Sequence, residues 1–446
     1  MNYQSFKQSV IARAEALGIT EYELYYMTAE STSISAFAHE MNEFSASTEG
    51  GVCFRCIVDG KMGYASTESL TQEQAASIVE KAADNARTLE AEEPVFLAAG
   101  GQVYASLDRE NYELPETEEL IRSVLDTQEK LYAAGAVDGC TSRGIRERSM
   151  VGIFNSKGLD LCQENTVAGF IVGAVVARGE EKTNDYQIAL GKLDTLDTQV
   201  LTQKAVDTAL GKLGGEAAPT GVYPVVFDPE AMSDLLGVFS GVFSSEAAQK
   251  GLSKFAKAED TVVASPMVTI VDDPFHPENP QPMPFDAEGS PTCKKNVVEQ
   301  GVLKTLLYNL KTANMAGKKT TGNAAKANYD APIVVRPFSM YLASGEYTQA
   351  QLLEKAQNGV FINSLSGLHA GANPVTGDFS LQSAGFMIEY GQKTRAVKSF
   401  TVAGNFYDLL KGIIAVGDDL RLPMATGMTA YGAPSVLVEG LSIAGK

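Results

Sequence analysis

The segment DPEAMSDLLGVFSGVFSSEAAQKGLSKF, Asp228 to Phe255, decides how the rest of the chain is interpreted. Asp228 followed by Pro229 is a helix-start signal, because Asp accepts hydrogen bonds from free amides and Pro fits the first helical turn. Apolar side chains then recur at helical spacing at Leu235, Leu236, Phe239, Val242 and Phe243. This spacing predicts one helix over 228–255 with a buried apolar face.

A single carboxylate interrupts that apolar face. Glu246 follows Phe239 by two helical turns, so the helical spacing places it on the same stripe. A carboxylate on a buried face needs a partner or a purpose. Lys250, four residues further, is in the favourable position for an ion pair. The local pattern favours a structural pair, and the alternative is that Glu246 remains from a catalytic helix.

Length and charge set the outer bounds. The chain has 446 residues, which predicts roughly two or three domains. Its net charge of −19 argues against a broad nucleic-acid surface, which needs clustered Lys and Arg. No apolar run approaches the ~20 residues of a membrane span. The start, MNYQSFKQSVIARAEALG, predicts an amphipathic helix rather than a signal peptide, so we expect a cytoplasmic protein without membrane contact.

The cysteine pattern does not indicate a metal or redox site. The chain has five cysteines, and Cys53 and Cys56 form a CxxC within GGVCFRCIVDGKMGYAS. Alternating residues around Asp59-Gly60 predict a β-hairpin there. Cysteines three residues apart on a strand point to opposite faces, so we interpret both as packing residues.

The order of predicted elements indicates an α+β protein. The linker GGEAAPTG at 214–221 divides an N-terminal α/β domain with a β-hairpin, residues 1–218, from a β-rich C-terminal domain, residues 219–446. In the first domain we predict helices at 3–17, 71–89, 116–134 and 196–213, and strands at 21–27, 33–38, 51–66 and two or three within 144–176. In the second we predict a hairpin at 297–308 with its turn at Gln300-Gly301, and a short helix at 405–411. We also predict strands at 223–227, 267–271, 332–338, 359–363, 379–390, 396–403, 413–416 and 434–439.

The chain lacks the common catalytic and nucleotide motifs. It has no GxxxxGK[ST], no GxGxxG after a strand, no GxSxG and no HExxH. Of its three histidines, His39 is predicted in an exposed loop and His276 in a turn. His369 lies between glycines in SGLHAGANPVTGDFSL, where a loop role is favoured and a site role stays open.

Longer stretches carry a family resemblance. SGLHAGANPVTGDFSLQSAGFMIEYGQ (366–392), VAGNFYDLLKGIIAVGDDL (402–420) and DDPFHPENPQPMPFDAEGSPT (272–292) resemble the TldD/PmbA family, and GGVCFRCIVDGKMGYAST is similar to the family's N-terminal hairpin. The resemblance runs from end to end. Members of this family are called modulators of DNA gyrase. They are also called zinc peptidases, a name that comes from one of the two subunits.

The resemblance also indicates a branch. The TldD branch has HExxxH on this helix and a late Cys as third zinc ligand, whereas this chain has Ser245-Glu246-Ala247-Ala248-Gln249-Lys250 and no Cys in 425–432. A Ser hydroxyl is a poor zinc ligand and a Lys ammonium repels the ion. With all three ligands replaced, no zinc-activated water is expected here. The chain thus resembles the PmbA branch, also called TldE.

This branch implies a non-catalytic subunit. Such a chain would pair with a TldD-like subunit bearing HExxxH and zinc, in a heterodimer that cleaves unfolded or extended peptides; a homodimer of the chain alone stays open. We expect no cofactor in this chain and Glu246 as the one vestigial catalytic candidate. The candidate binding residues are Ser245, Glu246, Lys250, His369, Asn373 and Asp378. Two alternatives remain, a regulatory or binding protein acting on DNA gyrase or its inhibitors, and a hydrolase active on its own.

Overall fold

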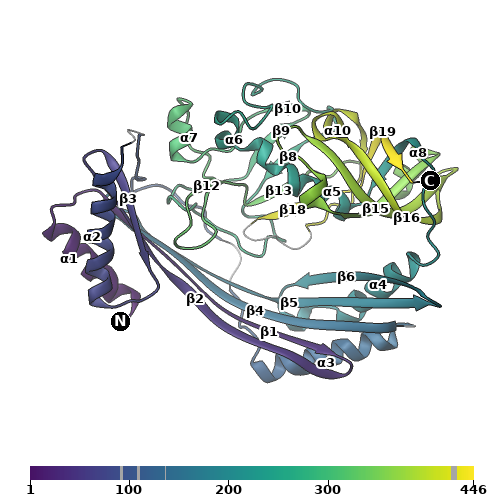
Figure 1. Cartoon of the computed structure of the whole chain (residues 1–446), viewed down its shortest axis with the longest axis horizontal. Helices are drawn as coiled ribbons and strands as arrows, with labels where there is room; N and C mark the ends of the chain where they lie inside the picture. The colour runs from purple at the N-terminus through teal and green to yellow at the C-terminus, as the bar shows by residue number, and fades with distance from the viewer. Residues whose placement is uncertain (91–93, 108–110, 136, 423–428, 446) are drawn as a thin grey trace.

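The structure is a computed structural model that describes residues 1–90, 94–107, 111–135, 137–422 and 429–445. It is an α+β protein rich in strands, as the sequence predicted. Figure 1 shows a long curved sheet from the N-terminal half, drawn in purple and teal, beneath a C-terminal part drawn in green and yellow. The predicted domain division after residue 218 falls between the last helix of the first half and the first strand of the second.

The N-terminal sheet has six strands in the order β3-β2-β1-β4-β5-β6, and each neighbouring pair is antiparallel. Its strands are β1 (Tyr22–Phe37), β2 (Glu40–Val58), β3 (Lys61–Thr67), β4 (Val137–Asn155), β5 (Asp160–Arg178) and β6 (Glu181–Leu190). The predicted hairpin at 51–66 is confirmed by the pairing of β2 with β3. The two strands predicted at 21–27 and 33–38 are one strand, because β2 and β4 pair with the Ser- and Thr-rich residues between them.

Four helices cover one face of this sheet. They are α1 (Tyr3–Ala16), α2 (Gln72–Thr88), α3 (Thr117–Ala133) and α4 (Thr198–Gly211). Helices α1 and α2 bury Leu24 of β1, and α3 and α4 bury Ile34 of the same strand. Because these two residues are an even number of positions apart, they lie on one face. The four predicted helices are thus confirmed within two residues at each end.

The opposite face of the sheet packs on the C-terminal part. Tyr25, Cys53 and Ile153 form an apolar cluster with Phe285 and Ala324. Cys56, in contrast, packs among the residues beneath α1 and α2. The two cysteines therefore point to opposite faces as packing residues, which confirms the interpretation of the CxxC.

The C-terminal part contains two larger sheets and a short one. The six-stranded sheet has the order β16-β15-β14-β7-β19-β17, and its strands are β7 (Gly221–Phe227), β14 (Gly359–Ser366), β15 (Asp378–Glu389), β16 (Gln392–Asn405), β17 (Ile413–Val416) and β19 (Val436–Ala444). The five-stranded sheet has the order β10-β9-β8-β13-β18, and its strands are β8 (Ile270–Asp272), β9 (Lys295–Glu299), β10 (Val302–Leu303), β13 (Ser339–Leu342) and β18 (Ala430–Gly432). The short sheet pairs β11 (Ala324–Ala325) with β12 (Val334–Val335). The strand predicted at 332–338 is mostly wrong, because β12 contains only Val334 and Val335. Pro337 has no N–H to donate, so the strand does not continue through it.

Six helices accompany these sheets: α5 (Pro229–Phe239), α6 (Ser245–Gln249), α7 (Leu310–Met315), α8 (Gln349–Ala356), α9 (Leu368–Gly371) and α10 (Phe406–Gly412). Helix α5 lies at the centre of the main core, where the Phe239 ring stacks on Phe406 with centroids 4.6 Å apart. No helix of the described residues is long and apolar enough to cross a membrane.

The single helix predicted over 228–255 is wrong. Helix α5 ends at Phe239, a 3-10 turn spans Ser240–Phe243, and α6 then begins. The Ser244 hydroxyl accepts the Ala247 N–H at 3.4 Å and so caps a new helix. Gly251 has a φ of +72°, and this left-handed residue ends it. Local caps thus outweigh the continuous apolar spacing.

Candidate functional site

Helix α6 holds the first predicted site residues, and Ser245 does not face an open site. The side chain is buried, and its hydroxyl donates to Thr312 Oγ1 at 2.8 Å. Thr312 belongs to α7, where Asn309 forms a capping box with it. Ser245 therefore ties α6 to α7.

Glu246 and Lys250 form the predicted ion pair. The distance from Lys250 Nζ to Glu246 Oε1 is 2.6 Å. The Lys250 side chain is 61% exposed and the Glu246 side chain is 31% exposed. The expectation that Glu246 continues the buried stripe is wrong, because the 3-10 turn before Ser244 changes the rotation of the following helix. Its carboxylate lies at the surface and already has a cationic partner.

These residues do not fit a zinc ion. Zinc takes neutral imidazole nitrogen, thiolate or carboxylate ligands. Here the Ser245 hydroxyl is engaged by Thr312, and the Lys250 ammonium has no lone pair to offer. In the described part of the chain, no three His, Cys, Asp or Glu side chains are grouped to hold a metal. Residues 425–428 of the late segment lie outside the described residues, and Thr429 to Gly432 contain no cysteine.

The other candidates occupy the 366–380 loop, mostly at the surface. His369 is exposed in α9. Asn373 Oδ1 accepts the N–H groups of Val375 and Thr376 at 3.0 and 3.2 Å, so this side chain shapes the loop. Asp378 accepts from Asn405 Nδ2 at 2.8 Å, and this hydrogen bond holds the pKa of Asp378 below its usual value.

Tyr407 links this loop to the segment that follows α6. Gly377 has a φ of +84°, and an added Cβ would meet the Tyr407 ring at 2.5 Å. The Tyr407 hydroxyl accepts the Lys254 N–H at 3.3 Å, and Lys254 Nζ lies 4.8 Å from the ring centroid. A shallow cavity of about 470 Å³ beside the loop is lined by Asn373 and Asp378, but not by any candidate residue of α6. This cavity therefore includes candidates of the loop and none of α6.

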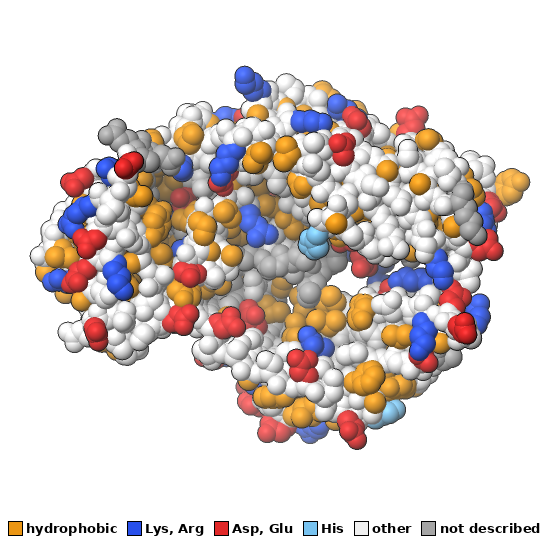
Figure 2. All heavy atoms as spheres, viewed as in Figure 1, with side chains coloured by type: hydrophobic (Ala, Val, Ile, Leu, Met, Phe, Trp, Pro, Cys, Tyr) orange, Lys and Arg blue, Asp and Glu red, His pale blue; other side chains and the backbone are white. Residues whose placement is uncertain are grey.

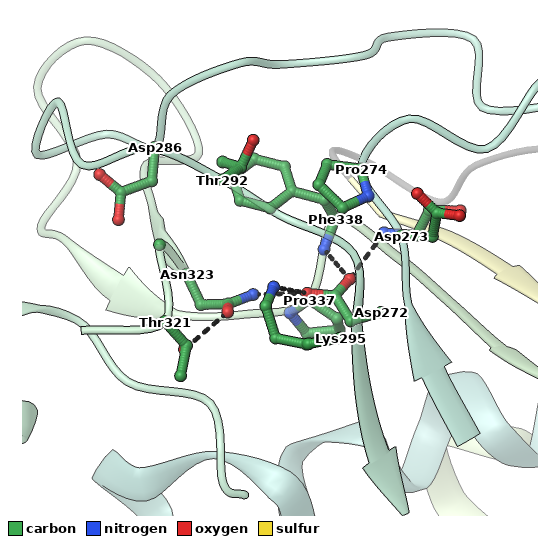
Figure 3. Close-up of polar contacts among 12 residues, drawn as sticks. Asp272, Asp273, Pro274, Asp286, Thr292, Lys295, Thr321, Asn323, Pro337 and Phe338 are labelled. Atoms are coloured by element: carbon green, nitrogen blue, oxygen red, sulfur yellow. Dashed lines mark hydrogen bonds and ion pairs between the residues drawn. The ribbon is translucent and has the colours of Figure 1, made fainter. Parts of the chain in front are cut away.

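One buried carboxylate of the C-terminal part, to which the sequence patterns assigned no role, accepts from four donors. Asp272, at the end of β8, is fully buried (Figure 3). One oxygen accepts the N–H groups of Phe338 and Ser339 at 2.9 and 3.1 Å. The other accepts from Asn323 at 2.7 Å and from Lys295 at 3.0 Å. Four donors therefore satisfy the oxygens of this carboxylate, and Lys295 supplies the compensating charge.

The Asp272 contacts position the strand beside the late segment. Phe338 and Ser339 lead into β13, which pairs in parallel with β18. The Thr429 hydroxyl donates to Pro337 O at 2.7 Å, and Ala430 N donates to Phe338 O at 3.0 Å. Asp272 thus fixes the chain just after residues 423–428. The sequence offered only the paired carboxylates Asp272-Asp273 at the end of the predicted strand 267–271, and this pattern does not identify their partners.

The two remaining histidines lie as predicted. His39 is exposed, with Nδ1 2.7 Å from Glu129 and its ring stacked on Tyr132. His276 forms a turn, donating its N–H to Asp273 O at 3.2 Å. Burial lowers the pKa of His276, and its Nδ1 accepts the Glu278 N–H.

The chain matches models of one known protein family over most of its length. Models of the PmbA/TldA metallopeptidases match residues 22–86 as domain 1, 110–213 as the central domain and 220–445 as the C-terminal domain. The last match alone covers more than half of the chain. The chain belongs to the PmbA/TldD family.

Individual members of the PmbA/TldD family align with nearly the full chain. The metalloprotease PmbA homologue of Haemophilus influenzae is 24% identical over 425 residues, which cover 93% of this chain and 90% of that protein. The crystal structure of a putative modulator of a DNA gyrase from Thermotoga maritima is 29% identical, with a TM-score of 0.90 and coverage of 99% and 100%. TldE from Thermococcus kodakarensis has the same fold, with a TM-score of 0.89, 23% identity and coverage of 99% and 100%.

Proposed function

We propose that this chain is the non-catalytic subunit of a cytoplasmic heterodimeric zinc peptidase that cleaves unfolded or extended peptides. One observation supports the proposal: in a family of metallopeptidases, the candidate residues of α6 and its C-cap Lys250 bond to other protein groups and include no imidazole or thiolate ligand. Ser245 is bonded to Thr312, and Lys250 is paired with Glu246. The hydrolytic step would therefore belong to a homologous subunit that carries HExxxH and zinc.

The same contacts count against a hydrolase that acts alone. A general base must reach a water or substrate proton at about 2.6–3.2 Å, and the Glu246 carboxylate already holds the Lys250 ammonium at 2.6 Å. His369 is the other candidate base, and it lies in a loop whose cavity α6 does not line.

The name of the Thermotoga protein suggests the second candidate, a role toward DNA gyrase. The net charge of −19 disfavours direct DNA contact in such a role. A protein partner would be required, and no contact among the described residues points to one. The peptidase-subunit proposal therefore has the stronger support.

Reconstitution tests the proposal. This chain and a family member bearing HExxxH from the same organism are purified separately, then assayed alone and mixed on an unfolded fluorescent polypeptide. We expect no cleavage by this chain, cleavage by the mixture, and a 1:1 complex on a sizing column. Elemental analysis after chelator treatment is expected to find zinc with the partner only. Full activity of the partner alone, or about one zinc per molecule of this chain, would overturn the proposal.

A further inference from the structure

A cavity of about 420 Å³ lies between the two halves of the molecule, away from α6. Its walls are β6 and α4 on one side, and the first turns of α5, the end of β14 and Arg421-Leu422 on the other. Figure 2 shows the molecule hollowed between its lower sheet and its upper part, with Lys and Arg side chains gathered at one end of this hollow. The volume lies within the roughly 300–1,000 Å³ typical of small-ligand sites.

Two basic side chains in this cavity have no partner. Lys204 of α4 and Arg421 make no side-chain hydrogen bond or ion pair with the described residues. Burial, together with the neighbouring Arg421 charge, lowers the pKa of Lys204. By contrast, Lys212 in the same cavity is paired with Asp185 at 2.8 Å. Glu230, Asp185 and Asp228 favour the charged form of Lys204 from nearby, but none of them forms an ion pair with it. Both basic groups therefore keep free donors for an anionic group.

Two acidic side chains on the facing helix are also unpaired. Glu230 and Asp234 are four residues apart on α5, so they share a face. Neither forms a hydrogen bond or ion pair with the described part of the chain. Burial raises the pKa of Asp234 to about 6 and also raises the pKa of Glu230. Lys204, Lys212 and Arg421 oppose this rise at Glu230, whereas no basic side chain of the described residues opposes it at Asp234. The α5 wall therefore offers two carboxylates for a cationic group, and Asp234 is the less compensated of the two.

An unused amide and a free strand edge lie between these charges. Asn363 is the extra residue of a bulge in β14, and its Oδ1 is buried without a hydrogen-bond partner in the described structure. Bulges commonly redirect a side chain beside a site. On the opposite wall, Tyr186 and Ile188 belong to β6, the last strand of its sheet, and both are substantially exposed. An edge strand presents main-chain groups that an extended peptide can pair with.

We propose that this cavity binds a short extended peptide with free termini. Lys204 and Arg421 hold its α-carboxylate, and Glu230 and Asp234 hold its α-ammonium. The Asn363 amide and the edge of β6 contact the main chain between the two ends. A simple anion would leave the α5 carboxylates unused, and a simple cation would leave Lys204 and Arg421 unused. The choice of a peptide rests on the proposed function, whereas the charge pattern is independent of it.

Calorimetric titration of the complete chain, without any partner subunit, tests the site. The ligands are trialanine, which has both terminal charges, N-acetyl-trialanine, which lacks the α-ammonium charge, and trialanine amide, which lacks the α-carboxylate charge. Because a hydrogen bond to a charged group contributes about 1.5–3 kcal/mol, each blocked terminus should weaken binding by about tenfold or more. Equal affinity for the three peptides, or no binding of trialanine at millimolar concentration, would overturn the proposal.

A variant then assigns the two ends. Lys204→Met should weaken trialanine binding and nearly abolish the difference between trialanine and its amide, while the penalty for N-acetylation persists. Asp234→Asn should show the reverse pattern. Lys81→Met, on the exposed face of α2, is the matched control and should bind like the unaltered chain. Unchanged discrimination in Lys204→Met would exclude this lysine from carboxylate binding. Because no partner is present, failure here leaves the reconstitution result intact.

Discussion

Two carboxylates, Glu246 and Asp272, differ in their surroundings, and this sets what each contributes. Glu246 is 31% exposed and meets one lysine across a short surface helix. Asp272 is fully buried and accepts from four donors on three segments. Water screens the first pair and is excluded from the second.

Glu246→Gln should cost at most about 1 kcal/mol in the free energy of unfolding, because exposed helical pairs contribute little. Urea denaturation of the isolated chain measures this cost. The variant should support the activity of the reconstituted complex as well as the unaltered chain does. Loss of joint activity without a change in stability would instead assign Glu246 a catalytic role.

Asp272→Ala should be far more damaging, by about 3–5 kcal/mol, because it leaves the buried Lys295 charge and several N–H groups unpaired. The same denaturation experiment applies. Asp84→Ala, which removes one partner of an exposed pair in α2, is the control and should cost less than about 1 kcal/mol. A loss in Asp272→Ala no larger than in this control would contradict the assigned role.

For single residues, the sequence predicted a local ion pair but not the long-range partners of a buried side chain. The family resemblance implied that Ser245 and Lys250 stand where the TldD branch has zinc ligands. The Glu246–Lys250 pair follows from their spacing. The role of Asp272 depends on Asn323 and Phe338, more than 50 residues away, and local patterns carry no information about such contacts.

Among the elements, local signals succeeded where caps and turns dominate. The helix predicted from residue 71 is capped by Thr71, whose hydroxyl accepts the Gln74 N–H at 3.2 Å. The first half of β2 was missed because its residues are polar and exposed, and only its pairing with β1 makes it a strand. The break after Phe239 was missed because apolar spacing continues through it.

Asp228, the cap of α5, should make stability depend on pH. Burial raises the pKa of Asp228 to about 7, despite its hydrogen bond from the Ala231 N–H. Glu230 raises this pKa further, whereas Lys393 and Arg421 lower it. Between the unfolded pKa of about 4 and pH 7, the unfolded state releases this proton first. The contribution of Asp228 to stability is therefore present below pH 4 and is lost as the pH rises toward 7.

Asp228→Asn keeps a capping side chain and removes this titration. Relative to the unaltered chain, the variant should gain about 1–3 kcal/mol between pH 4 and pH 7, and the difference should level off above that. Urea denaturation across this range measures it. Asp197→Asn, at the exposed cap of α4, is the matched control for losing a capping carboxylate. A stability difference that does not change with pH would refute the assignment.

For the whole molecule, the sequence indicated the α+β class and the family but not how the halves meet. The N-terminal sheet is formed by long-range antiparallel pairing, and β1 pairs with β4 more than 100 residues later. Its inner face contacts Phe285 and Ala324 of the second half. The cavity beside β6 arises from this contact and has no counterpart in any single motif. Topology and the interface between the halves therefore required the structure.

The 366–380 loop is considered with the whole molecule, because we propose that it acts next to a partner subunit. The exposed His369 side chain makes no hydrogen bond or ion pair with the described residues, whereas Asn373 shapes the loop through Val375 and Thr376. If the loop borders the peptide path, His369→Ala with Asn373→Ala should lower the joint activity with the HExxxH-bearing subunit severalfold, while the complex still assembles on a sizing column. His39→Ala, an exposed histidine at the far end of the N-terminal sheet, is the control. Because the His369 side chain makes no such bond, His369→Ala alone separates contact with substrate from loss of loop shape. Full activity of the doubly substituted complex would remove the loop from the peptide path.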